Sequence, residues 1–280
     1  MIKSKIHVDD ILGDFDSPIY IGGGSQKQVY SAIHSSFGEV TVKIGRYTSD
    51  TEFERISREV RLLQSANSKY FPKQFSFEPK SNSRYCIVEE FIDGDPLEQH
   101  LSGYTVPKDA LELLSHLVRG MSVFWLRRVV HRDLKPANIM ITNSNPRIID
   151  LGIARIQDAS SLTLSFAPFG PCTPNYASPE QLTNRKRYID HRSDQFTLGI
   201  VLGQLLLGGM HPFDPVVVKC GNNIPENIFH GAWGKETHSF TCNNEVFNLL
   251  STMLGLEPYQ RFRRYHDLED SIESIVGGFI

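Results

Sequence analysis

The period of the hydrophobic pattern changes near residue 93, and this change constrains the fold more than any other feature of the chain. From about Ile19 to Phe91, short runs with the two-residue period of β-strands alternate with glycine-rich turns. After the turn-forming segment 93–96 (DGDP), apolar residues recur at the three- and four-residue spacing of helices. We therefore expect an α+β fold, in which a small β-rich part is joined near residue 93 to a larger, mainly helical part.

One helical pattern interrupts the β-like part. Charged side chains fill one face of this pattern, and apolar side chains recur on the other face at Phe53, Ile56, Val60 and Leu63. The pattern predicts one amphipathic helix that packs on the sheet.

The composition is typical of a globular protein, and the length exceeds the usual size of one domain. The 280 residues are 40% hydrophobic and 22% charged, which favours a packed core over long disordered tails. We expect one large domain or two lobes that share a cleft. The net charge of -3 provides no general attraction for nucleic acid or an anionic membrane, so neither is an expected partner.

The sequence also favours a reducing, cytoplasmic location. Segment 1–10 (MIKSKIHVDD) lacks the apolar stretch of a secretion signal, and the apolar run 196–210 is shorter than the ~20 residues that span a bilayer. The four cysteines lie far apart without CxxC spacing, which argues against a zinc site or a dense disulfide framework.

Two segments of the β-like part have the residue types of a phosphate site. Segment 21–29 (IGGGSQKQV) lies between two β-like runs, and its glycines would let backbone N–H groups approach phosphate oxygens, although such a cluster alone is more often a tight turn. In segment 40–44 (VTVKI), strand periodicity puts Lys43 on the face opposite the valines. Glu59, on the predicted helix, could hold this ammonium group against phosphates; the alternative is two solvated charges.

The most specific signal is the pair of segments 131–138 (HRDLKPAN) and 148–152 (IIDLG). An ordinary polar turn would not require a carboxylate, a lysine and an amide at these offsets. On these motifs the chain resembles the eukaryotic-type (Hanks) protein kinase family from about residue 19 to about residue 265. The resemblance implies a two-lobed protein-kinase-like fold, with a small β-rich N-lobe containing one main helix, a larger helical C-lobe, and ATP between them.

The resemblance also implies domain boundaries and site residues. It divides the chain into an N-terminal extension (1–18), the N-lobe with the hinge (19–92), the C-lobe (93–275) and a tail (276–280). Asp133 would accept or orient the proton of the substrate hydroxyl, and Lys135 would steady the γ-phosphoryl group. Asn138 and Asp150 would hold Mg²⁺. The residues implied to bind the nucleotide are Ile21, Gly22, Gly24, Val29, Lys43, Glu59, Met140 and, through their backbone, Glu90 and Ile92.

More distant landmarks follow in the family's order. Segment 173–180 (TPNYASPE) resembles the end of an activation segment, and Asp194 with Gly199 matches the buried helix that anchors the catalytic loop. Arg261 lies where the family has the partner of Glu180. Each such pair, taken singly, is more often a pair of surface charges.

Several positions depart from the family pattern. Lys27 replaces the third glycine of the loop, Thr41 replaces an alanine, and Leu151 replaces the phenylalanine of the second motif. Cys172 and Ser178 are also unusual. Glu89 lies where an apolar residue or threonine is commoner, so a buried carboxylate there needs a hydrogen-bond partner, which the sequence does not identify.

The function implied is transfer of the γ-phosphoryl group of ATP to serine or threonine hydroxyls of a protein substrate. Lys135 and Thr173 favour the serine/threonine branch over the tyrosine branch. The alternatives are a pseudokinase scaffold and a kinase for small molecules; the latter relatives typically lack the equivalents of Lys135 and Pro179-Glu180. Autophosphorylation is expected in the activation segment, with Arg132 pairing the phosphate, at Ser160, Ser161, Thr163 or Ser165. Control is expected from a regulatory protein partner or a neighbouring activity.

Overall fold

The computed structural model describes residues 9–23, 27–66, 68–143, 145–150, 155–156, 172–241 and 243–279. The chain forms two compact units, residues 1–93 and 94–280, which we call the sheet unit and the helical unit. Among the described residues, no helix is long and apolar enough to cross a membrane.

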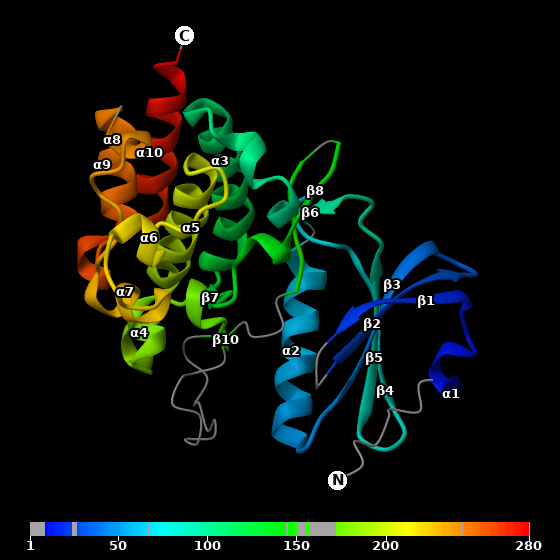
Figure 1. Ribbon diagram of the computed structural model, residues 1–280. Coiled ribbons are helices and arrows are strands. Elements are labelled where there is room, and N and C mark those ends of the chain that lie inside the picture. The colour runs from blue at the N-terminus through cyan, green and yellow to red at the C-terminus, as the bar shows by residue number, and fades with distance from the viewer. Residues whose placement is uncertain are drawn as a thin grey trace. The chain divides into compact units, whose positions relative to one another are not determined.

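The sheet unit is built on one antiparallel sheet of five strands (Figure 1). The strand order is β1-β2-β3-β5-β4, so β1 and β4 are the edges. The strands are β1 (Asp16–Gly23), β2 (Lys27–His34), β3 (Gly38–Arg46), β4 (Gln74–Lys80) and β5 (Arg84–Glu90). Gly23, with φ of 150°, ends β1 in a conformation that favours glycine.

One face of this sheet forms a hydrophobic core. Val40, Val42 and Ile44 of β3 are fully buried, and they pack in a cluster with Ile11 and Leu12 of the short helix α1 (Asp9–Leu12). The predicted alternation along β3 is therefore confirmed. Ile11 and Leu12 thus belong to the core, although the sequence analysis assigned them to an N-terminal extension (1–18).

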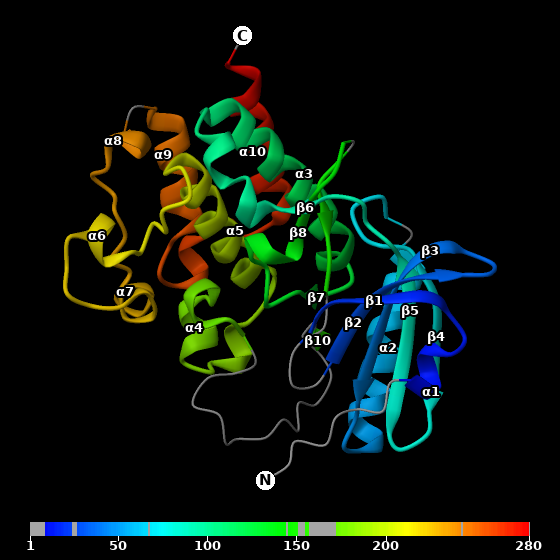
Figure 2. The same cartoon turned by 45° about the vertical axis from the view of Figure 1, so that its right-hand side comes forward.

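The helix α2 (Asp50–Ala66) packs on the opposite face. Phe53 of α2 stacks on Phe77 of β4 with ring centroids 5.5 Å apart, and Val60 is buried. Phe77 is paired with Ile87, and Ile87 with Lys43, so α2 and Lys43 lie on the same face. Figure 2 shows α2 running along the strands, and the predicted packing of one amphipathic helix on the sheet is confirmed.

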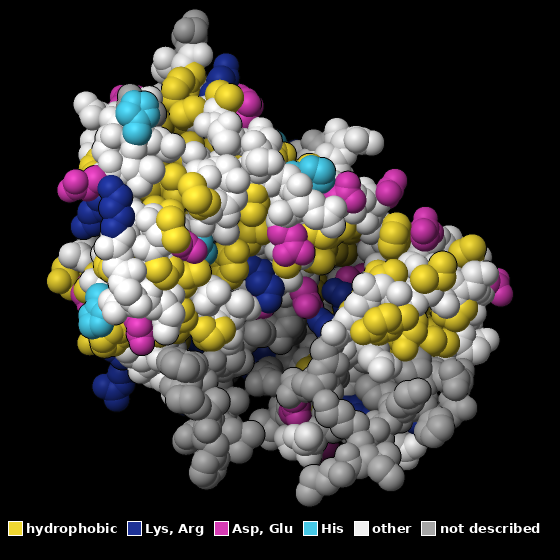
Figure 3. Space-filling view, in the orientation of Figure 1, with side chains coloured by type: hydrophobic (Ala, Val, Ile, Leu, Met, Phe, Trp, Pro, Cys, Tyr) yellow, Lys and Arg dark blue, Asp and Glu magenta, His cyan; other side chains and the backbone are white. Residues whose placement is uncertain are grey.

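The outer strands leave apolar side chains in solvent. Figure 3 shows hydrophobic side chains gathered on the surface of the sheet unit. Those of β1 and β2 that are at least half exposed are Ile19, Tyr20, Ile21 and Ile33.

The helical unit has α5 at its centre. This helix is buried along nearly its whole length and contacts both α3 and α9, while α10 packs against α3 and α9 (Figure 1). The long helices are α3 (Pro107–Trp125), α5 (His191–Leu206), α9 (Asn244–Met253) and α10 (Tyr265–Gly277). The short ones are α4 (Pro179–Leu182), α6 (Pro215–Val218), α7 (Ile224–His230) and α8 (His238–Thr241).

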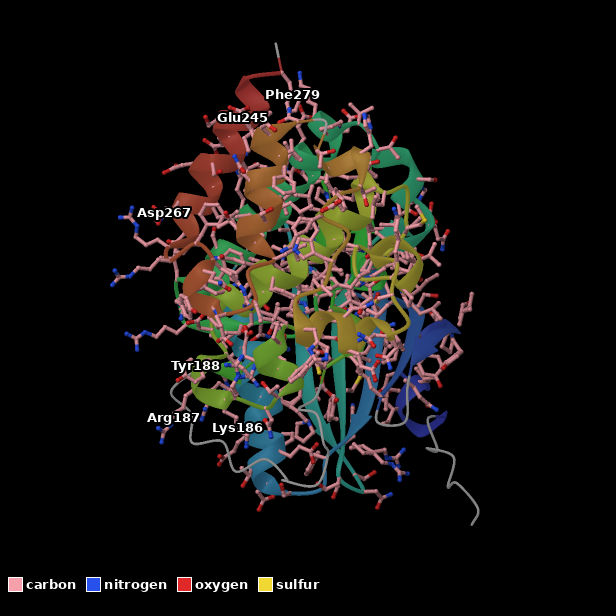
Figure 4. The ribbon with its side chains drawn as sticks, turned by 60° about the vertical axis from the view of Figure 1, so that its left-hand side comes forward. Lys186, Arg187, Tyr188, Glu245, Asp267 and Phe279 are labelled. Carbon is pink, nitrogen blue, oxygen red and sulfur yellow. The ribbon has the colours of Figure 1, made fainter. Side chains whose placement is uncertain are left out.

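Short strands and 3₁₀ turns lie between the helices of the helical unit. The strands are β6 (Asp95–Pro96), β7 (Val129–Val130), β8 (Ile139–Ile141), β9 (Arg147–Ile148) and β10 (Arg155–Ile156). The 3₁₀ turns are η1 (Leu97–Gln99), η2 (Leu101–Tyr104), η3 (Pro136–Asn138), η4 (Pro174–Tyr176), η5 (Lys186–Tyr188) and η6 (Pro258–Gln260). Figure 4 shows Lys186 and Arg187 of η5, and Asp267 of α10, at the surface. The predicted α+β class, a β-rich part followed by a mainly helical part, is confirmed.

Candidate functional site

The loop at residues 131–133 is fixed to the buried helix α5 through Asp194. One carboxylate oxygen of Asp194 accepts from Trp125 Nε1 and from the backbone N–H of His131, both at 2.9 Å. The other oxygen accepts from the backbone N–H of Arg132 at 3.0 Å, and Arg132 has φ of 71°. Burial raises the pKa of Asp194, while the N–H donors act in the opposite direction. The predicted role of Asp194 as an anchor of this loop is confirmed.

Asp133 is held by two side chains that follow it in the sequence. Its Oδ1 accepts from the hydroxyl of Thr173 at 2.6 Å and from the backbone N–H of Thr173 at 3.0 Å. Lys135 Nζ lies 3.0 Å from Oδ2 of Asp133 and donates to Thr173 Oγ1 at 2.8 Å. A carboxylate, an ammonium group and a hydroxyl thus form one closed network.

Asn138 joins this network, and the hairpin of β8 and β9 places Asp150 next to Asn138. Asn138 Nδ2 donates to the backbone oxygen of Asp133 at 2.9 Å and reaches Oδ2 of Asp133 at 3.3 Å. Because the side-chain nitrogen faces Asp133, the Oδ1 atom of Asn138 remains as the oxygen that could face a cation. The backbone N–H of Ile149 donates to the carbonyl of Asn138 at 2.9 Å, which brings Asp150 beside it.

The pKa of the buried His131 ring depends on its burial and on nearby carboxylates. Burial lowers the pKa of His131 most strongly, and the carboxylates of Asp194, Asp133 and Asp150 oppose that effect in this order. The His131 ring accepts the backbone N–H of Asp133 at Nδ1, at 3.3 Å. The buried imidazole is therefore neutral at neutral pH, although the carboxylates favour its charged form.

The side chains of Asn138 and Asp150 fit a magnesium ion that is coordinated partly by the protein and partly by phosphate oxygens. Magnesium is usually held by one or two carboxylates together with substrate phosphates and water. The amide oxygen of Asn138 and the carboxylate of Asp150 are ligands of that kind. In the part of the chain that the structure describes, no group of three or more His, Cys, Asp or Glu side chains could hold a metal by itself.

The segment that carries Thr173 is anchored by a buried ion pair. Arg261 Nη1 and Nη2 donate to the two oxygens of Glu180 at 2.7 and 3.0 Å, and neither side chain is exposed. Ser193 Oγ also donates to Glu180, at 2.6 Å, and the guanidinium group of Arg261 lies 4.7 Å from the ring centroid of Phe196. The predicted pair of Glu180 and Arg261 is confirmed as a buried bridge.

Gln181 provides a second anchor, which the sequence reasoning missed. Its Nε2 donates to the backbone oxygen of Arg132 at 2.9 Å, and its Oε1 accepts from the backbone N–H of Ser178 at 3.1 Å. Ser178 and Gln181 form a capping box at the start of α4. The spacing S-x-x-Q could have revealed the cap, but not the bond to Arg132.

Cys172 lies beside Thr173 and is half buried. Burial raises the pKa of its thiol to about 11, and Asp133 acts in the same direction. The thiol is therefore protonated at neutral pH, which makes it a poor nucleophile.

In the sheet unit, Lys43 is paired with Glu89. Lys43 Nζ lies 2.5 Å from Oε1 of Glu89, and Gln74 Nε2 donates to Oε2 of Glu89 at 2.7 Å. All three residues are at least 92% buried. This pair supplies the partner of Glu89 that the sequence did not identify. The side chain of Glu59 on α2 lies outside the described residues, so its pairing with Lys43 stays a prediction.

Comparison with known families identifies the chain. The family described as the protein kinase domain matches residues 16–270. The chain belongs to the protein kinase family. The resemblance seen in the motifs is thereby confirmed.

Several relatives of this kinase domain are named serine/threonine-protein kinases. The chain is 34% identical over 266 residues to pkn2 of Myxococcus xanthus, with 90% of this chain and 31% of that protein covered. It is 31% identical over 265 residues to PrkC of Bacillus subtilis, with 91% and 39% covered. Against drp72 of Corynebacterium efficiens the identity is 30% over 285 residues, with 98% and 53% covered. The chain thus spans about a third to a half of these relatives' length.

The other predicted nucleotide residues of the sheet unit lie in its strands or directly after them, so the strands reach further into segment 21–29 than the sequence pattern predicted. Ile21 and Gly22 are in β1, and Val29 of β2 is paired with both Gly22 and Lys43. Glu90 ends β5, and Ile92 follows it and is buried.

In the helical unit, Met140 is in β8 and is half buried. Several predicted positions lie outside the described residues: Gly24, Leu151, Gly152, Ser160, Ser161, Thr163 and Ser165.

Proposed function

We propose that the protein transfers the γ-phosphoryl group of ATP to serine or threonine hydroxyls of protein substrates. The observation that carries the proposal is the network in which Thr173, Lys135 and Asn138 hold the Asp133 carboxylate. Protein kinases generally use ATP and Mg²⁺ and act on proteins. The relatives' names favour serine and threonine as acceptors.

In this proposal the side chains of the helical unit orient the acceptor and neutralise charge. Asp133 accepts or orients the proton of the substrate hydroxyl, and Lys135 places a positive charge 3.0 Å from that carboxylate. Asn138 and Asp150 would hold Mg²⁺, which neutralises negative charge on the phosphates when it is bound. Phosphoryl transfer needs mainly alignment and charge neutralisation, and this set of residues provides both.

The sheet unit would bind the nucleotide. Lys43 is proposed to contact the α- and β-phosphates, with Glu59 as its partner on α2. Ile21 and Gly22 of β1, Val29 of β2 and Gly24 would cover the phosphates and the adenine ring. The backbone of Glu90 and Ile92 would bind the adenine edge, and Met140 would contact the ring.

The two alternatives account for fewer residues. A pseudokinase scaffold has no need of Lys43, Asp133, Asn138 and Asp150 together, and all four are present. A small-molecule kinase does not require the buried bridge of Glu180, which fixes the segment that would dock a peptide.

The test of this proposal is a radiolabel assay with Mg-ATP and a generic basic protein. Asp133→Asn should lower label transfer by about 10²–10⁴-fold, because it removes the general base. A thermal shift with Mg-ATP in both forms checks that the variant still folds and binds nucleotide. Undiminished transfer by the variant would point to a contaminating kinase and would contradict the proposal.

Regulation is proposed to act through the activation segment. Phosphate on Ser160, Ser161, Thr163 or Ser165 would pair with Arg132, and a regulatory partner protein would add further control. Mass spectrometry after incubation with Mg-ATP tests the first of these ideas, and alanine variants that leave both activity and phosphate content unchanged would rule it out. The cytoplasmic location and the two lobe boundaries also stay predictions from the sequence.

A further inference from the structure

We infer that Glu89 is a positioning residue for Lys43 and holds its ammonium group in place from within the sheet. The inference rests on the proposed function, because Lys43 is the proposed phosphate-binding lysine. In protein kinases generally, a glutamate on the main N-lobe helix pairs with this lysine, and movement of that helix controls the pair. Glu89 offers a second carboxylate, carried by a strand.

The geometry fixes Glu89 within the sheet. β5 lies between β3 and β4, and Glu89 is paired with Thr41 on one side and with Gln74 on the other. Its Oε1 reaches Lys43, one pleat further along β3, while Gln74 Nε2 binds its Oε2. A bulge between Gln74 and Ser76 sets this register. All three side chains therefore start from neighbouring strands of one sheet.

The burial of these groups makes the pair hard to separate. Lys43 is 8% exposed and Glu89 is 4% exposed. A charge taken out of water is costly unless it is paired and hydrogen-bonded, and here each charge compensates the other. Separation of the two groups would leave both charges buried without this compensation, so Glu89 stays beside Lys43.

The pair constrains the orientation of the Lys43 ammonium group. An ammonium group has three N–H donors in a fixed tetrahedral arrangement. One donor is directed at Glu89, and this contact restricts where the other two can point. Glu89 thus limits the rotamers of a long, flexible side chain before the nucleotide arrives, which lowers the entropy cost of binding phosphate.

The experiment compares the KM for ATP and kcat of the full chain and its variants. Glu89→Gln keeps the shape and removes the charge, and it should raise the KM for ATP by about tenfold, as expected for the loss of one charge-assisted hydrogen bond. The change in kcat at saturating ATP should be smaller. Glu89→Asp, which retains the charge, should recover part of the loss.

Two further variants separate positioning from structure. Glu89→Met introduces the apolar type of residue that is commoner at this position and removes the contact with Lys43, so the KM for ATP should stay high. Thermal unfolding of each variant checks that it is folded. Glu78→Gln is the matched control, because Glu78 also pairs with a lysine, Lys80 of the same strand β4, at 2.8 Å. The Glu78 side chain, however, is 56% exposed. This control should change neither quantity.

The outcomes distinguish the two proposals. An unchanged KM for ATP in folded Glu89→Gln and Glu89→Met would overturn the role of Glu89, and so would a lower KM, which would mean that Glu89 competes with the phosphates. If the unaltered chain transfers no phosphate, the proposed function fails. Binding of a fluorescent ATP analogue to the same variants then still decides whether Glu89 positions Lys43.

Discussion

At the scale of single residues, the proposed site of this kinase domain contains short charged contacts with little exposure to water. Asp133 and Lys43 each lie against a side chain of opposite charge, at 3.0 and 2.5 Å. The side chains of the first pair are 12% and 24% exposed, and those of the second are 10% or less. Water therefore screens these pairs weakly, and loss of one neighbour should be felt strongly.

Thr173 provides a test at this scale. Thr173→Val keeps the β-branched shape and removes the hydroxyl that binds both Asp133 and Lys135. We expect kcat to fall by about tenfold, because Asp133 loses one of the contacts that orient it. Steady-state assays at saturating Mg-ATP measure the change. Thr252→Val in α9 is the control, since that hydroxyl binds only a carbonyl of its own helix; equal losses in both variants would contradict the assigned role.

At the scale of elements, buried side chains join segments that are distant in the sequence. Asp194 joins α5 to the loop at 131–133, and Arg261 joins the turn after α9 to the start of α4. The orientation of Asp133 therefore depends on helices that do not themselves carry the reacting groups.

The bridge between Glu180 and Arg261 should be a major determinant of stability. Arg261→Met leaves the Glu180 carboxylate buried without its partner, and we expect a loss of about 3–5 kcal/mol in the free energy of unfolding. Denaturant titration measures this loss. Addition of Glu180→Gln should restore part of it, since the uncompensated charge is then removed.

The control for this prediction is Arg264→Met. Arg264 pairs with Asp267 of α10, whose side chain lies at the surface (Figure 4). Exposed ion pairs contribute little, so the midpoint of unfolding should stay the same. A similar loss in both variants would show that burial of the Glu180 bridge is not the cause.

At the scale of the whole molecule, the sequence predicted the class of fold and the anchors Asp194 and Glu180–Arg261. It did not predict contacts that depend on the pairing register of the strands. The valines of β3 follow a local period, and the motif around Asp133 follows fixed spacing, so both could be predicted. Gln74 faces Glu89 only because a bulge shifts β4 by one residue. The core contacts of Ile11 and Leu12 likewise depend on how a distant segment folds back.

Global stability should also depend on pH through His211. Burial lowers the pKa of His211 to about 4, from 6.5, and its ring binds the backbone oxygen of Asn175 at 2.9 Å. Between these two values the unfolded chain binds a proton that the folded chain excludes. Stability is therefore fully present above pH ~6.5 and falls as the pH drops toward about 4, by on the order of 3 kcal/mol.

A substitution separates this effect from general acid unfolding. In His211→Gln, the slope of the unfolding free energy against pH should be smaller between pH 6.5 and 4. Urea titrations at several pH values measure the slope. His230→Gln, at an exposed position on α7, should leave the slope as it is, and an unchanged slope in His211→Gln would contradict the prediction.

The long span between Glu180 and Arg261 has a consequence for how the chain matures. The two residues are 81 positions apart, and the guanidinium group belongs to the last part of the helical unit to be synthesised. Until that part has left the ribosome, the guanidinium group of Arg261 cannot compensate the charge of the Glu180 carboxylate, which is buried in the folded unit. The helical unit must therefore wait for nearly all of its own sequence before the segment that orients Asp133 can close.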